Sequence, residues 1–345
     1  MARGNPFGTH RVLEPLGVMP QAAKRLDCDM RSIYDNEILV DVERLNIDAA
    51  SFTQLEEEGE RDTAKIAGLI KKIIKERGKM HNPVTGSGGM FIGTVRRVGA
   101  DLVSRDLKPG DKIASLVSLS LTPLALKRIK KIDLEKDQVE VEAQAVLFES
   151  GVYAKLPADL PDRLCLALLD VAGAPAQTAR LVKPGDAVLV IGGGGKSGLL
   201  CLYEAKKRAG VTGRVIGLGH SASSTERIRE SGFADLAIQG DASKPLEVYE
   251  KILEVTDGKL MDVTINCVNI PGTEMASIMS TREGGIVYFF TMATSFTAAA
   301  LGAEGIGKDV NMIIGNGFAK GHDRITLELM RESPKLRALF ERMFL

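Results

Sequence analysis

The first half of the chain places apolar and polar residues in short patterns that predict strands. Glu37–Leu45 (EILVDVERL) alternates the two kinds, as a strand buried on one face does. Met90–Val98 continues this pattern, and Lys112–Val117 follows a turn, residues 108–111. Gln54–Lys79 differs, because its apolar residues recur at helical spacing. We predict mostly strands with one amphipathic helix, whose stripe is more simply explained by packing than by chemistry.

The second half predicts a regular strand–helix alternation. Short, continuous apolar runs alternate with helical stretches, which indicates a parallel sheet covered on both faces. The predicted strands are Ala187–Ile191, Arg214–Leu218, Leu236–Ile238, Val263–Ile265, Ile286–Phe290 and Val310–Ile314, and the predicted helices are Lys196–Arg208, Thr225–Ser231 and Leu246–Val255. Prolines punctuate the chain near Ala154–Asp162, where we expect the domain boundary. The chain therefore belongs to the α/β class, with two domains.

Four consecutive glycines follow the predicted strand Ala187–Ile191 and precede a predicted helix. Glycines let the backbone turn tightly and approach a diphosphate, and the helix start offers free N–H groups to that anion. The context of strand, glycines and helix is typical of a dinucleotide-binding loop rather than of a plain turn. The residues expected to contact the cofactor here are Gly192, Gly193, Gly194, Gly195, Lys196, Ser197 and Gly198.

The next predicted strand, Arg214–Leu218, should end beside the adenine ribose. No acidic residue follows it, so nothing there repels a 2′-phosphate. His220, Ser221 and Arg227 could receive such a phosphate, although each is equally well an ordinary polar loop residue. We expect NAD or NADP as the cofactor, with NADP tolerated.

Polar residues also follow two later strands of the predicted sheet. Because ligands bind at the carboxyl ends of parallel strands, we expect these residues to line the nicotinamide. They are Asn266, Cys267, Asn269, Thr291 and Met292. For Cys267 we expect a packing role rather than nucleophilic chemistry.

The composition excludes several classes of protein. The formal net charge is zero, which argues against a nucleic-acid binder and a membrane-surface protein. The four cysteines and four histidines are scattered, so we expect neither disulfides nor a metal motif. The N-terminus has no apolar core of a signal peptide, so we expect a cytoplasmic protein.

Several segments resemble the medium-chain dehydrogenase/reductase superfamily. Tyr153–Leu200 is similar to its hinge and first βα unit, Glu37–Phe52 to its first catalytic-domain strand, and Gly93–Ile113 to its GxVxxVG…KxGD segment. This resemblance implies a GroES-like, mostly-β catalytic domain over 1–155, a Rossmann domain over 156–318, and a segment 319–345 that returns to the catalytic domain.

A closer resemblance covers the whole chain, to the 3,5-diaminohexanoate dehydrogenases of lysine fermentation. It rests on the segments Gly8–Gly17, Ile33–Phe52, His81–Gly93, Leu116–Leu124, Leu168–Pro175, Ile265–Asn269 and Tyr288–Gly317. The resemblance implies NAD(P)-dependent oxidative deamination at C3, with 5-amino-3-oxohexanoate and ammonia as products.

The zinc ligands of the superfamily are missing. Asp48 stands about where the first zinc cysteine would be, Gly89 and Met90 replace a His-Glu pair, and Asp170 and Val171 cover the third position. Two carboxylates are a poor substitute for sulfur and imidazole ligands, so we predict no metal.

Carboxylates at these positions suit an amine substrate. An ammonium with a pKa near 10 must lose a proton before oxidation, which costs ~4 kcal/mol at pH 7. We expect Asp48 to be the base and Asp170 to hold an ammonium or a water, with His81 and Glu149 as reserves. Ser51 and Ser87 are candidate substrate contacts. Each Asp could equally be a helix cap.

Two other functions stay open. Zinc-independent NADPH quinone or enoyl reductases share this architecture by resemblance, and a non-catalytic dinucleotide-binding protein is a third class.

Val310–Ile314 is an apolar strand at the expected edge of the parallel sheet, and an uncovered sheet edge tends to pair with another strand. We therefore expect a homodimer that acts on a small amino acid, with no nucleic-acid or membrane partner.

Overall fold

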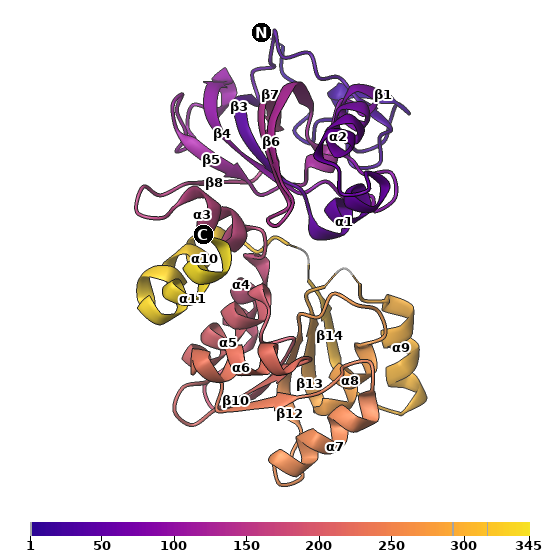
Figure 1. Ribbon diagram of the computed structural model, residues 1–345, viewed down its shortest axis with the longest axis vertical. Coiled ribbons are helices and arrows are strands. Elements are labelled where there is room, and N and C mark those ends of the chain that lie inside the picture. Colours follow the sequence, from indigo (N-terminus) through magenta and orange to yellow (C-terminus); the bar gives the residue numbers. More distant parts are fainter. Residues whose placement is uncertain (1, 292, 316) are drawn as a thin grey trace. The chain divides into compact units, whose positions relative to one another are not determined.

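The computed structural model of the protein describes residues 2–291, 293–315 and 317–345. The chain forms two compact units, Met1–Leu166 and Ala167–Leu345, drawn in Figure 1. The division falls inside helix α3 (Asp162–Leu169), later than the expected position 155. Strand β8 (Tyr153–Lys155), which ends at the expected position, pairs with β5 (Lys112–Ser115) in the sheet of the first unit.

The first unit is built on a six-stranded antiparallel sheet with the order β6-β7-β3-β4-β5-β8. The three strands predicted in this half are confirmed as β3, β4 and β5, whereas the long hairpin of β6 and β7 was not predicted. The strands are β1 (Val12–Glu14), β2 (Arg25–Leu26), β3 (Glu37–Asn46), β4 (Met90–Val98), β5 (Lys112–Ser115), β6 (Leu124–Asp133), β7 (Gln138–Phe148) and β8 (Tyr153–Lys155), and the 3-10 turns are η1 (Thr9–Arg11), η2 (Ala100–Leu102) and η3 (Leu119–Leu121).

The predicted single helix over Gln54–Lys79 is wrong in one respect, because two helices stand there. They are α1 (Ala49–Glu58) and α2 (Thr63–Arg77). Glu60 and Arg61 between them adopt left-handed φ angles of 53° and 56°, which a helix cannot accommodate. Asp62 then starts α2, because its side chain accepts hydrogen bonds from the first N–H groups of that helix.

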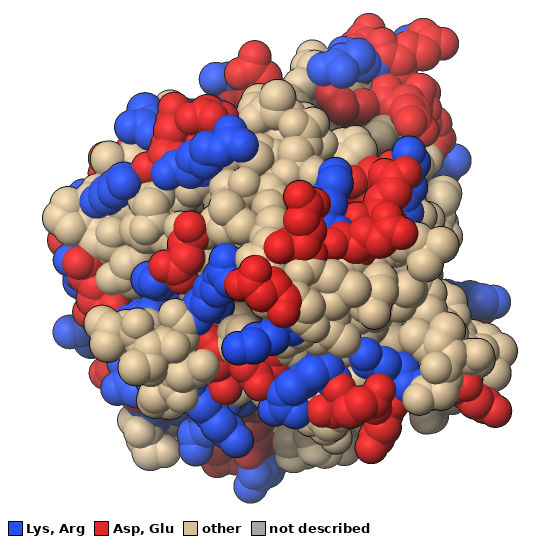
Figure 2. Space-filling view, turned by 90° about the horizontal axis from the view of Figure 1, so that it is seen from below, with Lys and Arg blue, Asp and Glu red and all other residues tan. Residues whose placement is uncertain are grey.

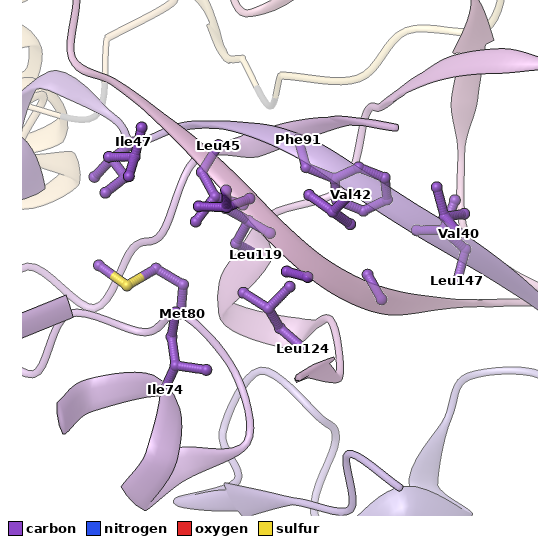
Figure 3. Close-up of a cluster of buried hydrophobic side chains, with 14 of the residues drawn as sticks. Val40, Val42, Leu45, Ile47, Ile74, Met80, Phe91, Leu119, Leu124 and Leu147 are labelled. Carbon is purple, nitrogen blue, oxygen red and sulfur yellow. The ribbon is translucent and has the colours of Figure 1, made fainter. Parts of the chain in front are cut away.

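The apolar stripe of α2 covers the main core of the first unit. Its residues Ile66, Ile70 and Ile74 are fully or almost fully buried, as the helical spacing predicted. Figure 3 shows Ile74 beside Met80, with Phe91 of β4 among the side chains of β3. The helix therefore has a packing role.

The second unit contains a six-stranded parallel sheet with the order β11-β10-β9-β12-β13-β14. This is the doubly wound order in which the direction of winding reverses between β9 and β12, where such folds bind ligands. The α/β fold class is thus confirmed. The strands are β9 (Ala187–Ile191), β10 (Arg214–Gly219), β11 (Leu236–Gln239), β12 (Met261–Asn266), β13 (Thr281–Phe289) and β14 (Asn311–Ile314), and the helices are α4 (Gly173–Leu181), α5 (Lys196–Ala209), α6 (Ala222–Ser231), α7 (Pro245–Val255), α8 (Glu274–Ser280), α9 (Phe296–Gly305), α10 (His322–Glu332) and α11 (Pro334–Phe344).

The C-terminal helices pack within the second unit. Helix α10 contacts α4 and α5, and α11 contacts α6. The hydroxyl of Thr326 donates a hydrogen bond to the carbonyl of Ala172, and Leu329 and Met330 are buried. Residues 319–345 thus belong to the second compact unit, and their expected return to the first domain stays a prediction.

Charges of both signs are interspersed on the face drawn in Figure 2, with no large area of one sign. None of the helices in the described ranges combines the length and the apolar character needed to span a bilayer.

Candidate functional site

The glycine loop lies at the carboxyl end of β9, beside the end of β12. Gly192 has a φ of +81°, and the N–H groups of Gly192 and Gly193 both donate to the carbonyl of Leu218 in β10. Gly195 is the N-cap of α5, and no side chain caps this helix. The first N–H groups of α5 are therefore left for an anion, as a dinucleotide loop requires.

Different glycines of this loop are needed for different reasons. A Cβ atom on Gly194 would lie 2.2 Å from the carbonyl oxygen of Ser224, and one on Gly198 would lie 2.1 Å from that of Gly192. These two glycines permit close packing of the loop and of α5. A Cβ atom on Gly195 would meet nothing closer than 3.5 Å, so this exposed glycine leaves space for a ligand. The cradle fits a diphosphate.

Lys196 and Asp170 form an ion pair. The Nζ atom of Lys196 lies 2.5 Å from Oδ2 of Asp170 and 5.9 Å from the centre of the Phe344 ring. From the sequence we expect Lys196 at the cofactor and Asp170 at the substrate, but in the structure the two side chains bind each other. The two side chains are about three-quarters covered, so their charges partly neutralise one another at the start of α5.

The two residues directly after β10, His220 and Ser221, are polar but not acidic. Ser221 caps α6 by accepting from the N–H of Ser224, and His220 is exposed. Arg227 donates from Nε to the carbonyl of Gly194, so it fastens α6 to the glycine loop. A nearby acid that the sequence analysis missed is Asp241, after β11; hydrogen bonds from Ser243 lower its pKa, and His220 lowers it further.

Asn266 has a structural role in the turn after β12, and its expected contact with the cofactor stays a prediction. It is completely buried, and its Nδ2 donates to the hydroxyl oxygens of Thr273 and Ser277, at 2.9 Å each. Its Oδ1 accepts from the N–H of Val268. The side chain thus holds the turn after β12, and its hydrogen-bonding atoms are occupied.

Cys267 follows Asn266 and packs against a second thiol. Its Sγ lies 3.9 Å from Sγ of Cys201 in α5. The hydrogen bond with Cys201, together with burial, raises the pKa of the Cys267 thiol. A thiol that stays protonated is a poor nucleophile, which supports the packing role.

Two loops at the carboxyl ends of the central strands are joined by a hydrogen bond. The hydroxyl of Thr291, after β13, donates to Oδ1 of Asn269, after β12, at 3.0 Å. The same hydroxyl oxygen accepts from the N–H of Ala293. Asn269 and Thr291 thus lie where a nicotinamide is expected, whereas Met292 lies outside the described residues.

In the first unit, Asp48 starts helix α1 and has one unused oxygen. Its Oδ1 accepts from the N–H of Ser51 at 3.0 Å, so the residue is a helix cap. Its Oδ2 is buried and has no hydrogen-bond partner in the part of the chain that the structure describes. A buried carboxylate oxygen without a donor is costly, so this atom is available for an ammonium or a water.

The loop after Met80 brings further candidates to the start of α1. Asn82 donates to the carbonyl of Ser51, and its own N–H donates to the carbonyl of Ser87. The hydroxyl oxygens of Ser51 and Thr85 lie 2.5 Å apart, so the Ser51 hydroxyl already has a hydrogen-bond partner within the protein. Ser87 closes the same loop, and these contacts place both predicted serines near the N-terminus of α1.

His81 lies in the same loop as a neutral imidazole. Burial lowers its pKa to about 4, and the positive charges of Lys79 and Arg77 add to this effect. Its Nδ1 atom is buried and finds no hydrogen-bond partner within the described ranges. His81 is therefore a weak base that can accept one hydrogen bond.

Glu149 is not part of this site. It follows β7, whose last residue Phe148 pairs with Glu37 at the start of β3, whereas Asp48 follows the end of β3. A ten-residue strand separates the two carboxylates by ~30 Å. Glu149 instead binds Asn36 and Arg3, which lower its pKa.

Lys79 supports the loop, and the sequence analysis missed it. It is completely buried, and its Nζ donates to the carbonyls of Pro20 and Gln21, at 2.7 and 3.2 Å. Gln21 in turn donates to the carbonyl of Gly86. Burial lowers the pKa of Lys79 to about 8. The residue ends the charged segment Gln54–Lys79, and nothing in the neighbouring sequence marks this lysine as buried.

A metal is not indicated by the geometry of the described residues, since among them no three His, Cys, Asp or Glu side chains gather to form a site.

The solved structures with a similar fold include a quinone oxidoreductase of Pseudomonas syringae, with a TM-score of 0.56, 20% identity, and coverage of 92% of this chain and 86% of that one. This likeness concerns the fold alone.

Sequence comparison is more specific. Residues 10–157 match the family model described as the N-terminal domain of L-erythro-3,5-diaminohexanoate dehydrogenase. A protein of that name from Acetoanaerobium sticklandii is 58% identical over 99% of this chain and 100% of its own length. Another, from Fusobacterium nucleatum, is 56% identical over the full length of both chains. Identity of this degree along the whole chain means that the protein belongs to the L-erythro-3,5-diaminohexanoate dehydrogenase family.

Proposed function

We propose that the protein oxidatively deaminates L-erythro-3,5-diaminohexanoate at C3, releasing 5-amino-3-oxohexanoate and ammonia in lysine fermentation. The observation that carries this proposal is the identity of 58% along 99% of the chain with a relative named for that substrate. The free Oδ2 atom of Asp48 supports it from the side of the geometry, because an amine substrate supplies the missing hydrogen-bond donor.

The cofactor in this proposal is a nicotinamide dinucleotide held by the glycine loop. The N–H groups at the start of α5 would bind its diphosphate, and Gly195 leaves room for it. When bound, the nicotinamide supplies the acceptor for the hydride that leaves C3. We propose that both NAD and NADP are accepted, since no acid follows β10 directly and Ser221 and His220 can receive a 2′-phosphate.

In the first unit, Asp48 carries out the proton transfers of the proposed reaction. Its Oδ2 binds the C3 ammonium and takes one proton, so that the C3–H bond can break with the nitrogen lone pair in place. The product of hydride loss is an iminium, and Asp48 releases its proton to solvent before the next step. Its Oδ2 then takes a proton from the water that adds to C3 and returns it to the nitrogen. The C–N bond breaks, ammonia leaves, and the hydroxyl proton passes to Oδ2 as the carbonyl forms. His81 stays neutral, so it adds no positive charge that would repel the substrate.

A homodimer is part of the proposal. β14 is the edge strand of the parallel sheet, and Ile314 on it is 56% exposed. Leu301 and Phe296 of the neighbouring α9 are exposed as well. An unpaired edge flanked by exposed apolar side chains favours pairing with a second copy.

An activity assay tests the function. The protein is mixed with NAD or NADP and 3,5-diaminohexanoate, and reduced cofactor, ammonia and the keto product are measured together. We expect equal amounts of the three. Oxidation of NADPH by quinones or enones, without turnover of the diamine, would instead favour a reductase. Binding of either dinucleotide without any turnover would favour a non-catalytic protein.

A further inference from the structure

A pocket on the sheet of the first unit has no part in the proposed reaction. It has a volume of about 510 Å³ and lies over β3, β4, β6 and β7, on the face that carries Leu39 and Gln144. Its charged lining consists of three arginines and one aspartate: Arg31, Arg96, Arg97 and Asp29. Among these four lining residues, two positive charges are therefore in excess.

A β-bulge brings two consecutive arginines to the pocket. Leu39 of β3 pairs with Arg97 of β4, whereas the next residue, Val40, pairs with Val95. Arg96 is thus an extra residue on β4. Consecutive side chains of a regular strand point to opposite faces, but a bulge re-aims them. Both arginines line the same pocket as a result.

Two of the three arginines have carboxylate partners, and one does not. Arg31 lies 2.6 Å from Asp29, and Arg96 lies 3.4 Å from Asp41. The Nε and Nη2 atoms of Arg97 are shielded from solvent, and neither has a hydrogen-bond acceptor among the residues that the structure describes. An enclosed guanidinium without an acceptor is unfavourable, so a partner is missing here.

We propose that this pocket binds a small-molecule oxyanion, a carboxylate or a phosphate group, on the guanidinium of Arg97. Nε and Nη2 lie along one edge of the guanidinium, and that edge makes two parallel hydrogen bonds with either group. The pocket volume is within the range of small-molecule sites. Because Nε and Nη2 are shielded in the structure, binding requires this edge of Arg97 to turn toward the entering anion, and Arg96 adds a second positive charge. The site goes beyond the proposed reaction and does not depend on it.

Titration calorimetry of the full-length protein tests the site. The probes are inorganic phosphate and, separately, citrate, with potassium chloride at equal ionic strength as the reference. We expect saturable binding of at least one probe, weakened at least tenfold in Arg97→Gln and unchanged in Arg229→Gln. Arg229 is a matched control, because it is an exposed arginine of α6 paired with Glu226. Binding of phosphate alone identifies a phosphoryl ligand, and binding of citrate alone a carboxylate.

Two further variants separate binding from folding. Arg97→Lys keeps the charge but loses the two-pronged edge, and we expect about tenfold weaker binding. Arg97→Met removes an unpaired charge, and we expect an unchanged or higher melting temperature without ligand. The proposal is overturned if neither probe binds saturably, if binding is the same in Arg97→Gln as in the native protein, or if Arg97→Met melts at a lower temperature. Phosphate binding that survives unchanged in Arg97→Gln belongs to the glycine loop, and this outcome too overturns the proposal.

Discussion

The ammonium of Lys196 and the carboxylate of Asp170, 2.5 Å apart, join the first residue of α5 to the segment between α3 and α4. Their pairing holds the ammonium beside the unused N–H groups of α5 and partly neutralises its charge. It also means that neither group is free in the way that its sequence position suggested.

Lys196→Met should weaken dinucleotide binding about tenfold, because loss of one charge-assisted hydrogen bond costs ~1.5 kcal/mol or more. Binding is measured by fluorescence titration at two salt concentrations. Lys207→Met is the control, since Lys207 lies on the same helix and pairs with Glu332. Equal dissociation constants for the two variants would contradict a role of Lys196 at the diphosphate.

Asp48→Asn should lower turnover at least 100-fold, the low end of what a general base contributes. Asparagine also caps helices, so we expect the melting temperature to stay nearly unchanged. Asp62→Asn provides the comparison, because Asp62 caps α2 in the same way. Steady-state rates near the native value for Asp48→Asn would eliminate Asp48 as the base.

Two glycine substitutions should have different effects. In Gly198→Ala the new methyl group meets the carbonyl of Gly192, so we expect a loss of ~1–3 kcal/mol in unfolding free energy. In Gly195→Ala we expect native stability but weaker cofactor binding, because the methyl group occupies the space left for the diphosphate. Urea denaturation and dinucleotide titration check the two properties. If Gly195→Ala binds normally, the diphosphate lies elsewhere.

Much of this loop could be predicted from the sequence because its signals are local. The strand Ala187–Ile191, the glycines and the start of α5 are neighbours in the chain, and each constrains the next. The same holds for β3 and β4, each of which is one continuous run of neighbouring residues, although both begin with four consecutive buried residues instead of a strict alternation.

Other features depend on residues that only folding brings together. Nothing near Asp170 in the sequence indicates Lys196, and nothing near Arg97 indicates the bulge against Leu39. The break between α1 and α2 was missed for another reason: Glu60 and Arg61 rarely adopt left-handed angles, so their residue types gave no warning.

The acid stability of the first unit should depend on Glu37. Burial raises its pKa, but hydrogen bonds from Arg11 and His10 prevail and lower it from 4.5 to about 2. A lowered carboxylate pKa stabilises the fold above about pH 4.5, and this contribution, ~3 kcal/mol, is lost as the pH falls toward 2. We therefore expect Glu37→Gln to be less stable at pH 7, with the difference narrowing below pH 4.5 in urea denaturation. Parallel curves at all pH values would contradict this.

Sedimentation velocity should find a dimer at micromolar concentration, and Ile314→Lys should raise its dissociation constant at least tenfold. A lysine on an edge strand opposes edge pairing. Val211→Lys serves as control, since Val211 is fully exposed in the turn after α5. A native protein that sediments only as a monomer would exclude this interface.

The strand order of the second unit constrains how the protein can be made. β12 lies directly beside β9, although β10 and β11 come between them in the chain. A nascent chain that ends before Met261 can form the glycine loop but not the opposite wall of its crevice. During translation the crevice therefore lacks one wall until β12 has left the ribosome. A chain truncated before Met261 should have no dinucleotide-dependent activity.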